Sequence, residues 1–217
     1  MKIVTICCDR YADTAPAFVE LLAKNWPDHK SVVFVTNSKP LAVTEPVVYL
    51  SERKDMAFGW RLRRFIRHHY TDEHLLFMMS DYFVKDVKPE LITIAHELCA
   101  TERVRHVRLR PMPHPQFIYD VDGFGMIDKK QRYSLSLQPG IWETRVLYDL
   151  CRDNENPWAT EINGSLRARD ITGVFLSTTE HAISHHNYYR KGRPQGVGWV
   201  RDNVNPEAWP EAVRRGK

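Results

Sequence analysis

Short apolar runs alternate along the chain with longer segments whose apolar residues recur at helical spacing. Residues 2–8 and 31–36 are rich in β-branched side chains, and residues 74–79 are nearly continuous in apolar ones. Runs of this kind are typical of strands that are buried in a sheet. Four more short strands are expected, at residues 47–50, 104–109, 133–137 and 174–177.

Helices are expected between these strands. Asp13 or Thr14 can cap a first helix that has Pro16 in its first turn and ends near residues 25–28. Residues 57–69 predict a basic helix with one apolar side. Further helices are expected at residues 89–100, 142–151 and 159–168, with a last helical turn at 187–191.

This alternation predicts an α/β fold, with a three-layer α/β/α arrangement around a mostly parallel sheet. Residues 111–130 suggest loops and a hairpin, so the second half is expected to add strands and helices to the same sheet. No linker divides the chain, and we predict one domain over residues 1–217. Residues 193–217 contain Pro194, Pro206 and Pro210 and are expected to wrap the surface as a tail.

The composition narrows the class of protein. Of the 217 residues, 43% are hydrophobic and 27% are charged, which excludes a disordered chain. No apolar run approaches the roughly 18 residues of a membrane span. The start of the chain also lacks a signal-peptide pattern, so we expect no integral membrane segment and a cytoplasmic location. Free thiols are favoured over a zinc site because no CxxC pair occurs among Cys7, Cys8, Cys99 and Cys151.

The charge favours an anionic ligand. A formal net charge of +4 suits a nucleotide diphosphate and would also tolerate DNA or RNA. The positive side chains gather in residues 61–67 and 190–193. There is no GxGxxG after the first strand and no GxxxxGK[ST] in the chain, which argues against Rossmann dinucleotide and P-loop sites.

Polar residues after the strands are the candidates for chemistry, because ligands of open α/β sheets bind beyond the carboxyl ends of the strands. Asp9 and Arg10 follow the first strand, where a carboxylate suits a ribose or base and a guanidinium suits a phosphate. Asp81 follows the apolar run 74–79 and is suited to holding Mg²⁺ or Mn²⁺ against a diphosphate. A polar turn or a helix cap is the simpler explanation of either acid.

Basic residues near the end of the chain extend this hypothesis. His185 is a candidate to complete a metal site with Asp81. Arg190, Lys191 and Arg193 follow closely and could close over the diphosphate. A packed histidine and a solvated basic face are the alternatives.

A second group of candidates concerns the acceptor. Glu161 lies one helical turn after Trp158, and a carboxylate in a partly dry site suits a general base for a hydroxyl. An acid in the first turn of a helix also simply favours the helix dipole. Gln138 is suited to hydrogen-bond hydroxyls and Trp142 to stack on a sugar face, although a core tryptophan is the alternative.

The order of these motifs resembles that of small glycosyltransferases of the GT-A fold, the nucleotide-diphospho-sugar transferase class. Asp9 is followed by a helix with Trp60 and Arg63, and then by Ser80-Asp81-Tyr82-Phe83. A Ser-Leu-Gln-Pro-Gly-Ile-Trp segment at 136–142 comes next, then Trp-x-x-Glu at 158–161 and Tyr-x-x-x-Gly at 188–192. The resemblance extends from about residue 3 to residue 192 and implies a GT-A-like fold.

The resemblance also implies roles. The loop at Asp9, with Arg10, Trp60 and Arg63, would hold the nucleotide-sugar donor. Asp81 would occupy the place of the DxD metal motif, and Glu161 would match the acid that deprotonates the acceptor in inverting members. Ser80-Asp81-Tyr82 supplies one acid where DxD supplies two. A divalent cation would therefore bind only with the donor, or Arg and Lys side chains would replace it.

We therefore predict transfer of a sugar from a nucleotide-diphospho-sugar to an acceptor hydroxyl, inverting, by direct displacement. The acceptor is expected to be a glycan or, as in phage-type enzymes, a modified base in DNA. A different class, a non-catalytic nucleic-acid or glycan-binding module, is favoured by the basic segment at 61–67 and by the 6 Trp, 9 Tyr and 9 Phe.

Overall fold

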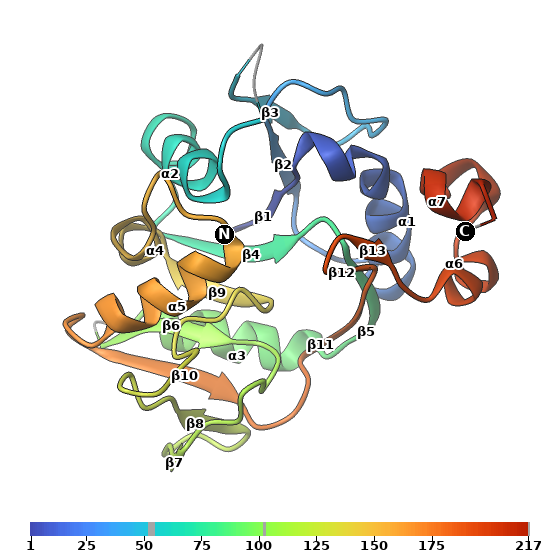
Figure 1. Ribbon diagram of the computed structural model, residues 1–217. Helices are drawn as coiled ribbons and strands as arrows, with labels where there is room; N and C mark the ends of the chain where they lie inside the picture. The colour runs from blue at the N-terminus through green and yellow to red at the C-terminus, as the bar shows by residue number, and fades with distance from the viewer. Residues whose placement is uncertain (52–54, 102, 217) are drawn as a thin grey trace.

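The computed structural model describes residues 1–51, 55–101 and 103–216. Within these ranges its centre is a nine-stranded sheet in the order β3-β2-β1-β4-β9-β6-β10-β8-β7 (Figure 1). The strands are β1 (Lys2–Ile6), β2 (Val32–Thr36), β3 (Val47–Tyr49), β4 (His74–Met79), β6 (Val104–Arg108), β7 (Phe117–Ile118), β8 (Phe124–Met126), β9 (Gly140–Glu143) and β10 (Val174–Thr178).

The strand directions decide which loops meet. β1 pairs in parallel with β2 and β4, β2 pairs in parallel with β3, and β6 pairs in parallel with β10. β9 lies between β4 and β6 and is antiparallel to both. The carboxyl ends of β1, β2, β4, β6 and β10 therefore lie at one edge of the sheet, together with the start of β9.

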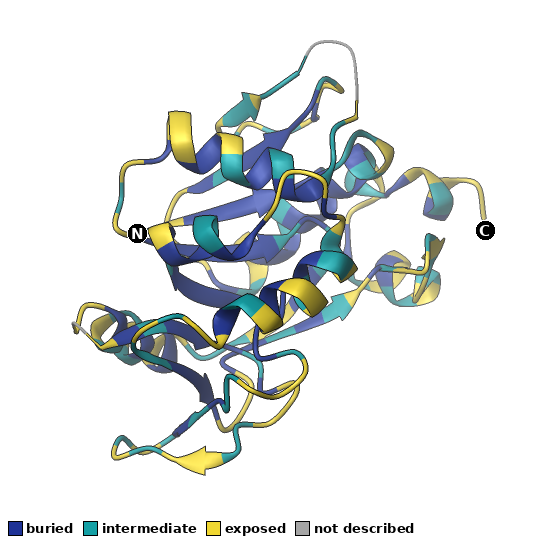
Figure 2. Cartoon of the chain, turned by 60° about the vertical axis from the view of Figure 1, so that its left-hand side comes forward, coloured by how far each residue is buried: buried dark blue, intermediate teal, exposed yellow. Residues whose placement is uncertain are grey.

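Helices cover both faces of this sheet. One face packs against α1 (Ala15–Asn25) and α3 (Pro89–Cys99), through residues such as Phe18 and Ile92. The other face packs against α2 (Phe58–His69), α4 (Thr144–Leu150) and α5 (Pro157–Ala168). Figure 2 shows the buried strands between helices that expose only their outer sides. This arrangement confirms the predicted three-layer α/β/α fold.

A separate two-stranded sheet follows β4. β5 (Tyr82–Val87) pairs with β11 (Ile183–Asn187) in an antiparallel ribbon, although the two strands lie far apart in the sequence. A short hairpin of β12 (Tyr189–Arg190) and β13 (Arg193–Pro194) follows directly. Residues from the last part of the chain are therefore brought back to the turn that follows β4.

The C-terminal segment packs on α1 (Figure 1). It contains α6 (Val197–Asn203), η2 (Pro206–Ala208) and α7 (Glu211–Arg214), and Val200 and Val213 are buried in the core. The amide of Asn205 donates to Glu20 Oε1 (2.9 Å), and the amide of Glu211 donates to Asp13 Oδ2 (2.8 Å). Asp13 itself lies in η1 (Asp9–Thr14), the turn that joins β1 to α1.

Three sequence predictions of secondary structure are wrong. Residues 133–137 form turns and irregular structure rather than a strand. Trp142 lies in strand β9 rather than in a helix, and helix α4 starts at Thr144. Residues 187–191 belong to β11 and the β12–β13 hairpin instead of a helical turn. Among the described helices, none has both the length and the hydrophobicity that a bilayer crossing requires.

Candidate functional site

The candidate site is built from loops at the carboxyl edge of the sheet. Asp9 follows β1, Asp81 follows β4 and Arg110 follows β6. Gln138 comes just before β9, and because β9 runs in the opposite direction, its start lies at this same edge. The topology therefore gathers four polar side chains from four distant parts of the sequence.

Asp81 lies in the tight turn between β4 and β5. Its backbone carbonyl accepts a hydrogen bond from the amide of Tyr188 (2.9 Å), and its carboxylate accepts from the amides of Asp81 and Tyr189. Burial raises the pKa of Asp81 to about 6, even though those two hydrogen bonds favour the charged form. Near neutral pH the carboxylate is therefore ionised but easily protonated.

A chain of contacts runs from Tyr82 to Gln138. The ring of Tyr82 stacks on the imidazole of His185 with centroids 4.2 Å apart. Arg110 Nη1 donates to His185 Nε2 (2.9 Å) and to Gln138 Oε1 (3.1 Å). Burial, and then the charge of Arg110, lowers the pKa of His185 to about 3, so its imidazole is neutral and Nε2 is an acceptor.

Glu161 reaches the same region from helix α5. Its Oε1 accepts hydrogen bonds from the amide of Leu137 (2.8 Å) and the hydroxyl of Ser136 (3.2 Å). Burial raises the pKa of Glu161, while those two hydrogen bonds and the charge of Arg108 act in the opposite direction. A partly buried carboxylate with a raised pKa is suited to taking a proton.

Tyr82 lies at the centre of these groups. Burial raises the pKa of its phenol, and the nearby charges of Asp81 and Glu161 raise that pKa further, whereas the charge of Arg110 lowers it. The phenol is therefore within electrostatic range of two acids and one guanidinium. We refer to Asp81, Tyr82, Arg110, Gln138, Glu161 and His185 as the Tyr82 cluster.

Asp9 lies beside this cluster and organises a loop. Its carboxylate accepts from the hydroxyl and amide of Ser38 (2.7 and 3.1 Å), the amide of Lys39 (3.1 Å) and the hydroxyl of Thr36 (3.3 Å). Burial alone would raise the pKa of Asp9, but these hydrogen bonds outweigh it and lower the pKa. Asp9 thus holds together the ends of β1 and β2.

The β12–β13 hairpin lies against the loop after β1. The rings of Tyr11 and Tyr189 stack with centroids 4.0 Å apart. Gly192, at the tip of the hairpin, adopts a φ of +74°, and a Cβ added there would lie 3.6 Å from Arg10 Nη2. The predicted donor-binding residues Arg10, Arg190, Lys191 and Arg193 are all exposed beside this contact.

Other predicted donor-binding residues lie on α2. Arg63 donates to the backbone carbonyls of Tyr148 and Cys151 (both 3.0 Å) and pairs with Asp153 (2.7 Å), so its guanidinium ties α2 to the segments around α4. Trp60 is partly exposed, and the Arg64 guanidinium lies over its ring. Neither residue touches the Tyr82 cluster in any described contact.

Of the three residues predicted to contact the acceptor, one does not fit. Trp142 is completely buried and stacks on His106 with centroids 3.5 Å apart, so it cannot stack on an acceptor sugar. The core position arises because Trp142 lies in the middle of β9, where it faces the helices of one layer. Trp158 is 63% exposed near the start of α5, and Gln138 belongs to the Tyr82 cluster.

The predicted metal ligands do not fit a divalent cation held by Asp81 and His185 together. Arg110 uses the Nε2 lone pair of His185, which a metal would need, and its positive charge repels a second cation. In the part of the chain that the structure describes, no three His, Cys, Asp or Glu side chains are grouped as metal ligands would be. We therefore derive no chemical step through a metal ion.

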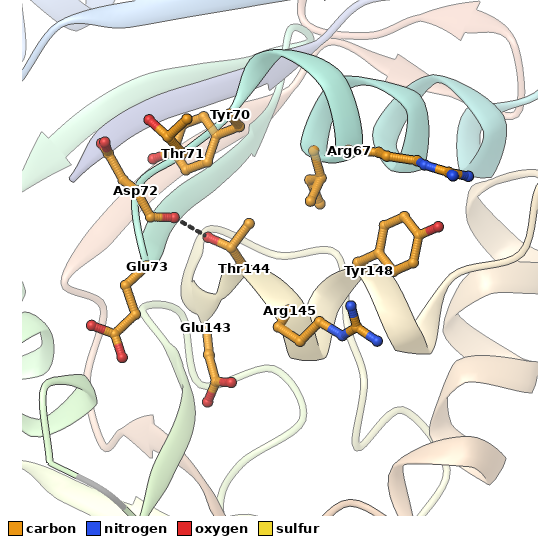
Figure 3. Close-up of a pocket in the computed structure, with 10 residues that line it drawn as sticks. Arg67, Tyr70, Thr71, Asp72, Glu73, Glu143, Thr144, Arg145 and Tyr148 are labelled. Carbon is orange, nitrogen blue, oxygen red and sulfur yellow. Dashed lines mark hydrogen bonds between the residues drawn. The ribbon is translucent and has the colours of Figure 1, made fainter.

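A cavity of about 630 Å³ lies elsewhere, at the opposite edge of the sheet (Figure 3). It is lined by Tyr70 and Asp72 before β4 and by Thr144 and Tyr148 of α4, and the Thr144 hydroxyl donates to the carbonyl of Asp72 (2.9 Å). Strand β4 separates this cavity from Asp81. Since ligands of open α/β sheets bind at the carboxyl edge, we place the candidate site at the Tyr82 cluster.

The sequence interpretation missed Arg110 and the central position of Tyr82. Arg110 comes two residues after the last residue of β6, so the rule on strand ends applied to it as it did to Asp9 and Asp81. Tyr82 was recognised only as part of the Ser-Asp-Tyr-Phe motif. Its pairing partner β11 is distant in sequence and carries His185, which explains why its position was not predictable.

Comparison with known proteins supports the fold. No protein-family model and no curated protein matches the sequence. A crystal structure of S. aureus TarS 1-349 in complex with UDP superposes with a TM-score of 0.59 at 15% identity, covering 84% of this chain and 59% of that one. The chain has a GT-A-like fold.

Two further solved structures extend this comparison. S. aureus TarS 1-349 in complex with UDP-GlcNAc gives a TM-score of 0.57 at 13% identity, over 89% of this chain and 60% of that one. HddC from Yersinia pseudotuberculosis gives 0.51 at 11% identity, over 100% and 99% of the two chains. The present chain thus spans about three-fifths of the TarS 1-349 structures, and the likeness concerns the GT-A-like fold.

Proposed function

We propose that this protein is a glycosyltransferase that moves a sugar from a nucleotide-diphospho-sugar to an acceptor hydroxyl. The observation that carries the proposal is a continuous set of contacts at the edge of a GT-A-like sheet where ligands bind. Tyr82, next to Asp81, stacks on His185; Arg110 joins His185 to Gln138; and the Leu137 amide beside Gln138 donates to Glu161. Structures with the same fold have been determined with UDP and with UDP-GlcNAc. A nucleotide-sugar is therefore the donor class that we assign to this edge.

Glu161 is proposed to act as the general base. Its carboxylate takes the proton of the acceptor hydroxyl while that oxygen forms a bond to the anomeric carbon. The bond from that carbon to the diphosphate breaks, and its electron pair leaves with the diphosphate oxygen. Burial supports this role because it raises the pKa of Glu161, and a base gains efficiency when its pKa approaches the working pH. Direct displacement of this kind inverts the anomeric centre.

The nucleoside part of the donor is proposed to lie between Asp9 and the β12–β13 hairpin, with its diphosphate directed toward the turn of Asp81 and Tyr82. Arg10 and the exposed Arg190, Lys191 and Arg193 offer positive charge to the diphosphate. Asp9 orders the loop after β1, and Asp81 orders the turn after β4 through its hydrogen bonds to the hairpin. A divalent cation, when bound with a donor, would supply additional charge on the diphosphate.

The acceptor side is proposed to involve Gln138 and Trp158, which flank Glu161. Both acceptor classes predicted from the sequence, a glycan and a modified base in DNA, present a hydroxyl to such a base. Contacts with DNA phosphates make binding strongly dependent on salt concentration, whereas binding of a neutral glycan depends little on it. Titrating each acceptor between low and high salt separates the two.

A panel of nucleotide-sugars tests the proposal directly. We expect one donor to raise the melting temperature of the protein, and the same donor to be consumed when an acceptor is supplied. The panel is run both with EDTA and with Mn²⁺. Binding of a glycan or DNA without any donor binding or turnover would instead support the non-catalytic binding module.

A further inference from the structure

Arg110 is held in a fixed position at the candidate site. It lies two residues beyond β6, and its Nη1 donates to Gln138 Oε1 (3.1 Å) and His185 Nε2 (2.9 Å). These two acceptors come from the segment before β9 and from strand β11. His185 is in turn fixed by stacking on Tyr82. The guanidinium is thus oriented by three separate elements.

The charge of Arg110 is not balanced by an acid. None of the ion pairs found in the described residues includes Arg110. Its two partners, Gln138 and His185, are both neutral, and its Nε is buried without a hydrogen-bond partner among those residues. A partly buried guanidinium is costly unless a negative group meets it. The arrangement therefore points to an anionic ligand.

The surroundings of Arg110 favour a strong interaction with such an anion. Arg190, Lys191 and Arg193 are exposed, and water and salt weaken their charges. Arg110 is only partly exposed, and a charge in that environment acts more strongly. Arg110 also occupies the Nε2 of His185, the atom that a cation shared by Asp81 and His185 would need.

We propose that Arg110 supplies the positive charge that binds the donor diphosphate, so that donor binding needs no divalent cation. The inference rests on the proposed function. In it, the Arg110 guanidinium takes the place of the metal ion that the two acids of a DxD motif would hold. Gln138 and His185 are positioning residues in this arrangement. They aim the guanidinium and leave its Nη2 to the ligand.

Calorimetry tests the inference without any need for turnover. The probes are inorganic pyrophosphate and the diphosphates UDP, GDP, CDP and ADP, each titrated in EDTA and in Mn²⁺. We expect wild-type protein to bind pyrophosphate and one of the nucleoside diphosphates. The affinity for each of these two ligands should be the same in EDTA as in Mn²⁺. Arg110→Met is expected to weaken this binding by about 10- to 100-fold, the usual range for loss of a charged hydrogen bond. Arg110→Lys is expected to retain part of it.

Arg145→Met is the matched control, because Arg145 is exposed on α4 at the opposite edge. Its diphosphate affinity is expected to equal that of wild type. Unchanged affinity in Arg110→Met, or wild-type binding that disappears in EDTA, would overturn the inference alone. A wild-type protein that binds no diphosphate under either condition would overturn the proposed function with it. If Arg110→Met fails to fold, Arg110→Lys tests the residue instead, and unchanged diphosphate affinity in that variant would equally overturn the inference.

Discussion

The ring of Tyr82 stacks on the imidazole of His185, with centroids 4.2 Å apart and an angle of 21° between the planes. This contact joins the turn after β4 to strand β11, and it fixes the imidazole that accepts a hydrogen bond from Arg110. A neutral histidine, an unbalanced guanidinium and two acids are thereby collected around one phenol. The histidine and the two acids can each be tested separately by substitution.

Replacing His185 should alter how stability depends on pH. Its folded pKa of about 3 lies below the ordinary value of 6.5, so the unfolded chain binds the proton more tightly. The stability contributed by the neutral form is complete above pH 6.5 and is lost as the pH falls toward 3. Between pH 6.5 and 5, His185 should lower the free energy of unfolding of the wild-type protein by about 2 kcal/mol. We expect this decrease to be absent in His185→Gln.

Urea unfolding of both proteins at several pH values measures this difference. His106 is also buried with a lowered pKa, but it is present in both proteins and cancels in the comparison. If the free energy of unfolding changed with pH equally in wild type and His185→Gln, protonation of His185 would not lower stability, which would contradict the prediction.

Asp81→Asn should raise stability and slow sugar transfer, because Asp81 orders the turn after β4 at the proposed site. The pKa of Asp81 is raised by burial to about 6, so the folded protein binds the proton more tightly than the unfolded chain. Its charge therefore lowers stability as the pH rises from about 4 to 6, and the penalty persists above pH 6. We expect Asp81→Asn to be about 1–3 kcal/mol more stable at pH 7.5 and to lose this advantage below pH 4.

Asp86→Asn is the matched control for Asp81→Asn, since Asp86 is exposed on the neighbouring strand β5. It should change neither stability nor transfer. Thermal unfolding and a donor turnover assay follow both properties in each variant. Undiminished turnover in Asp81→Asn would remove Asp81 from the proposed site.

Glu161→Gln should separate donor binding from transfer. The glutamine keeps an oxygen that can accept from the Leu137 amide and the Ser136 hydroxyl, so the local structure is expected to remain. It cannot take a proton, and the transfer rate should fall by about 10²- to 10⁴-fold while donor affinity stays the same. Single-turnover kinetics with calorimetry of the donor checks both halves. A normal rate would exclude Glu161 as the base.

The pH profile of transfer supplies a further check on Glu161. Its raised pKa means that the rate should decline with falling pH at a point above the ordinary 4.5 of a glutamate. The measurement is kcat/KM for the acceptor between pH 4 and 9 in wild-type protein. A rate that stays constant down to the ordinary pKa would contradict a buried base.

Two tryptophans should respond in opposite ways. Trp142→Ala removes a fully buried ring from the stack with His106 and should lower the free energy of unfolding by about 3–5 kcal/mol. Trp158→Ala removes a ring that is 63% exposed and should change stability by no more than about 0.5 kcal/mol. If Trp158 contacts the acceptor, its variant should raise the acceptor KM. Chemical denaturation and steady-state kinetics measure these effects.

The layered fold could be predicted from the sequence because its buried strands are continuous in apolar residues. The runs that became β1, β2 and β4 carry this signal over five or six residues each. β9 does not, since Gly140–Glu143 is too short for periodicity to separate strand from helix. Its assignment as a strand depends on pairing with β4 and β6, which the local sequence does not contain.

Part of the candidate site could be predicted from the sequence, because the ends of the buried strands could be predicted. Asp81, Gln138 and His185 follow or join predicted strands, whereas Glu161 lies beside Trp158 at the start of a predicted helix, and the four belong to one cluster. The hydrogen bond from Arg110 to His185, which argues against a shared metal, joins residues that are far apart in the chain. A contact of this kind becomes visible only when the strands are arranged in space.

The β12–β13 hairpin is synthesised after all the strands that it helps to complete. Asp81 receives backbone hydrogen bonds from Tyr188 and Tyr189, and Tyr11 stacks on Tyr189. A nascent chain that emerges from the ribosome therefore produces every strand of the main sheet before the segment that completes this edge. The proposed nucleotide affinity should thus be acquired late in translation, after the layers of the core are already available to assemble.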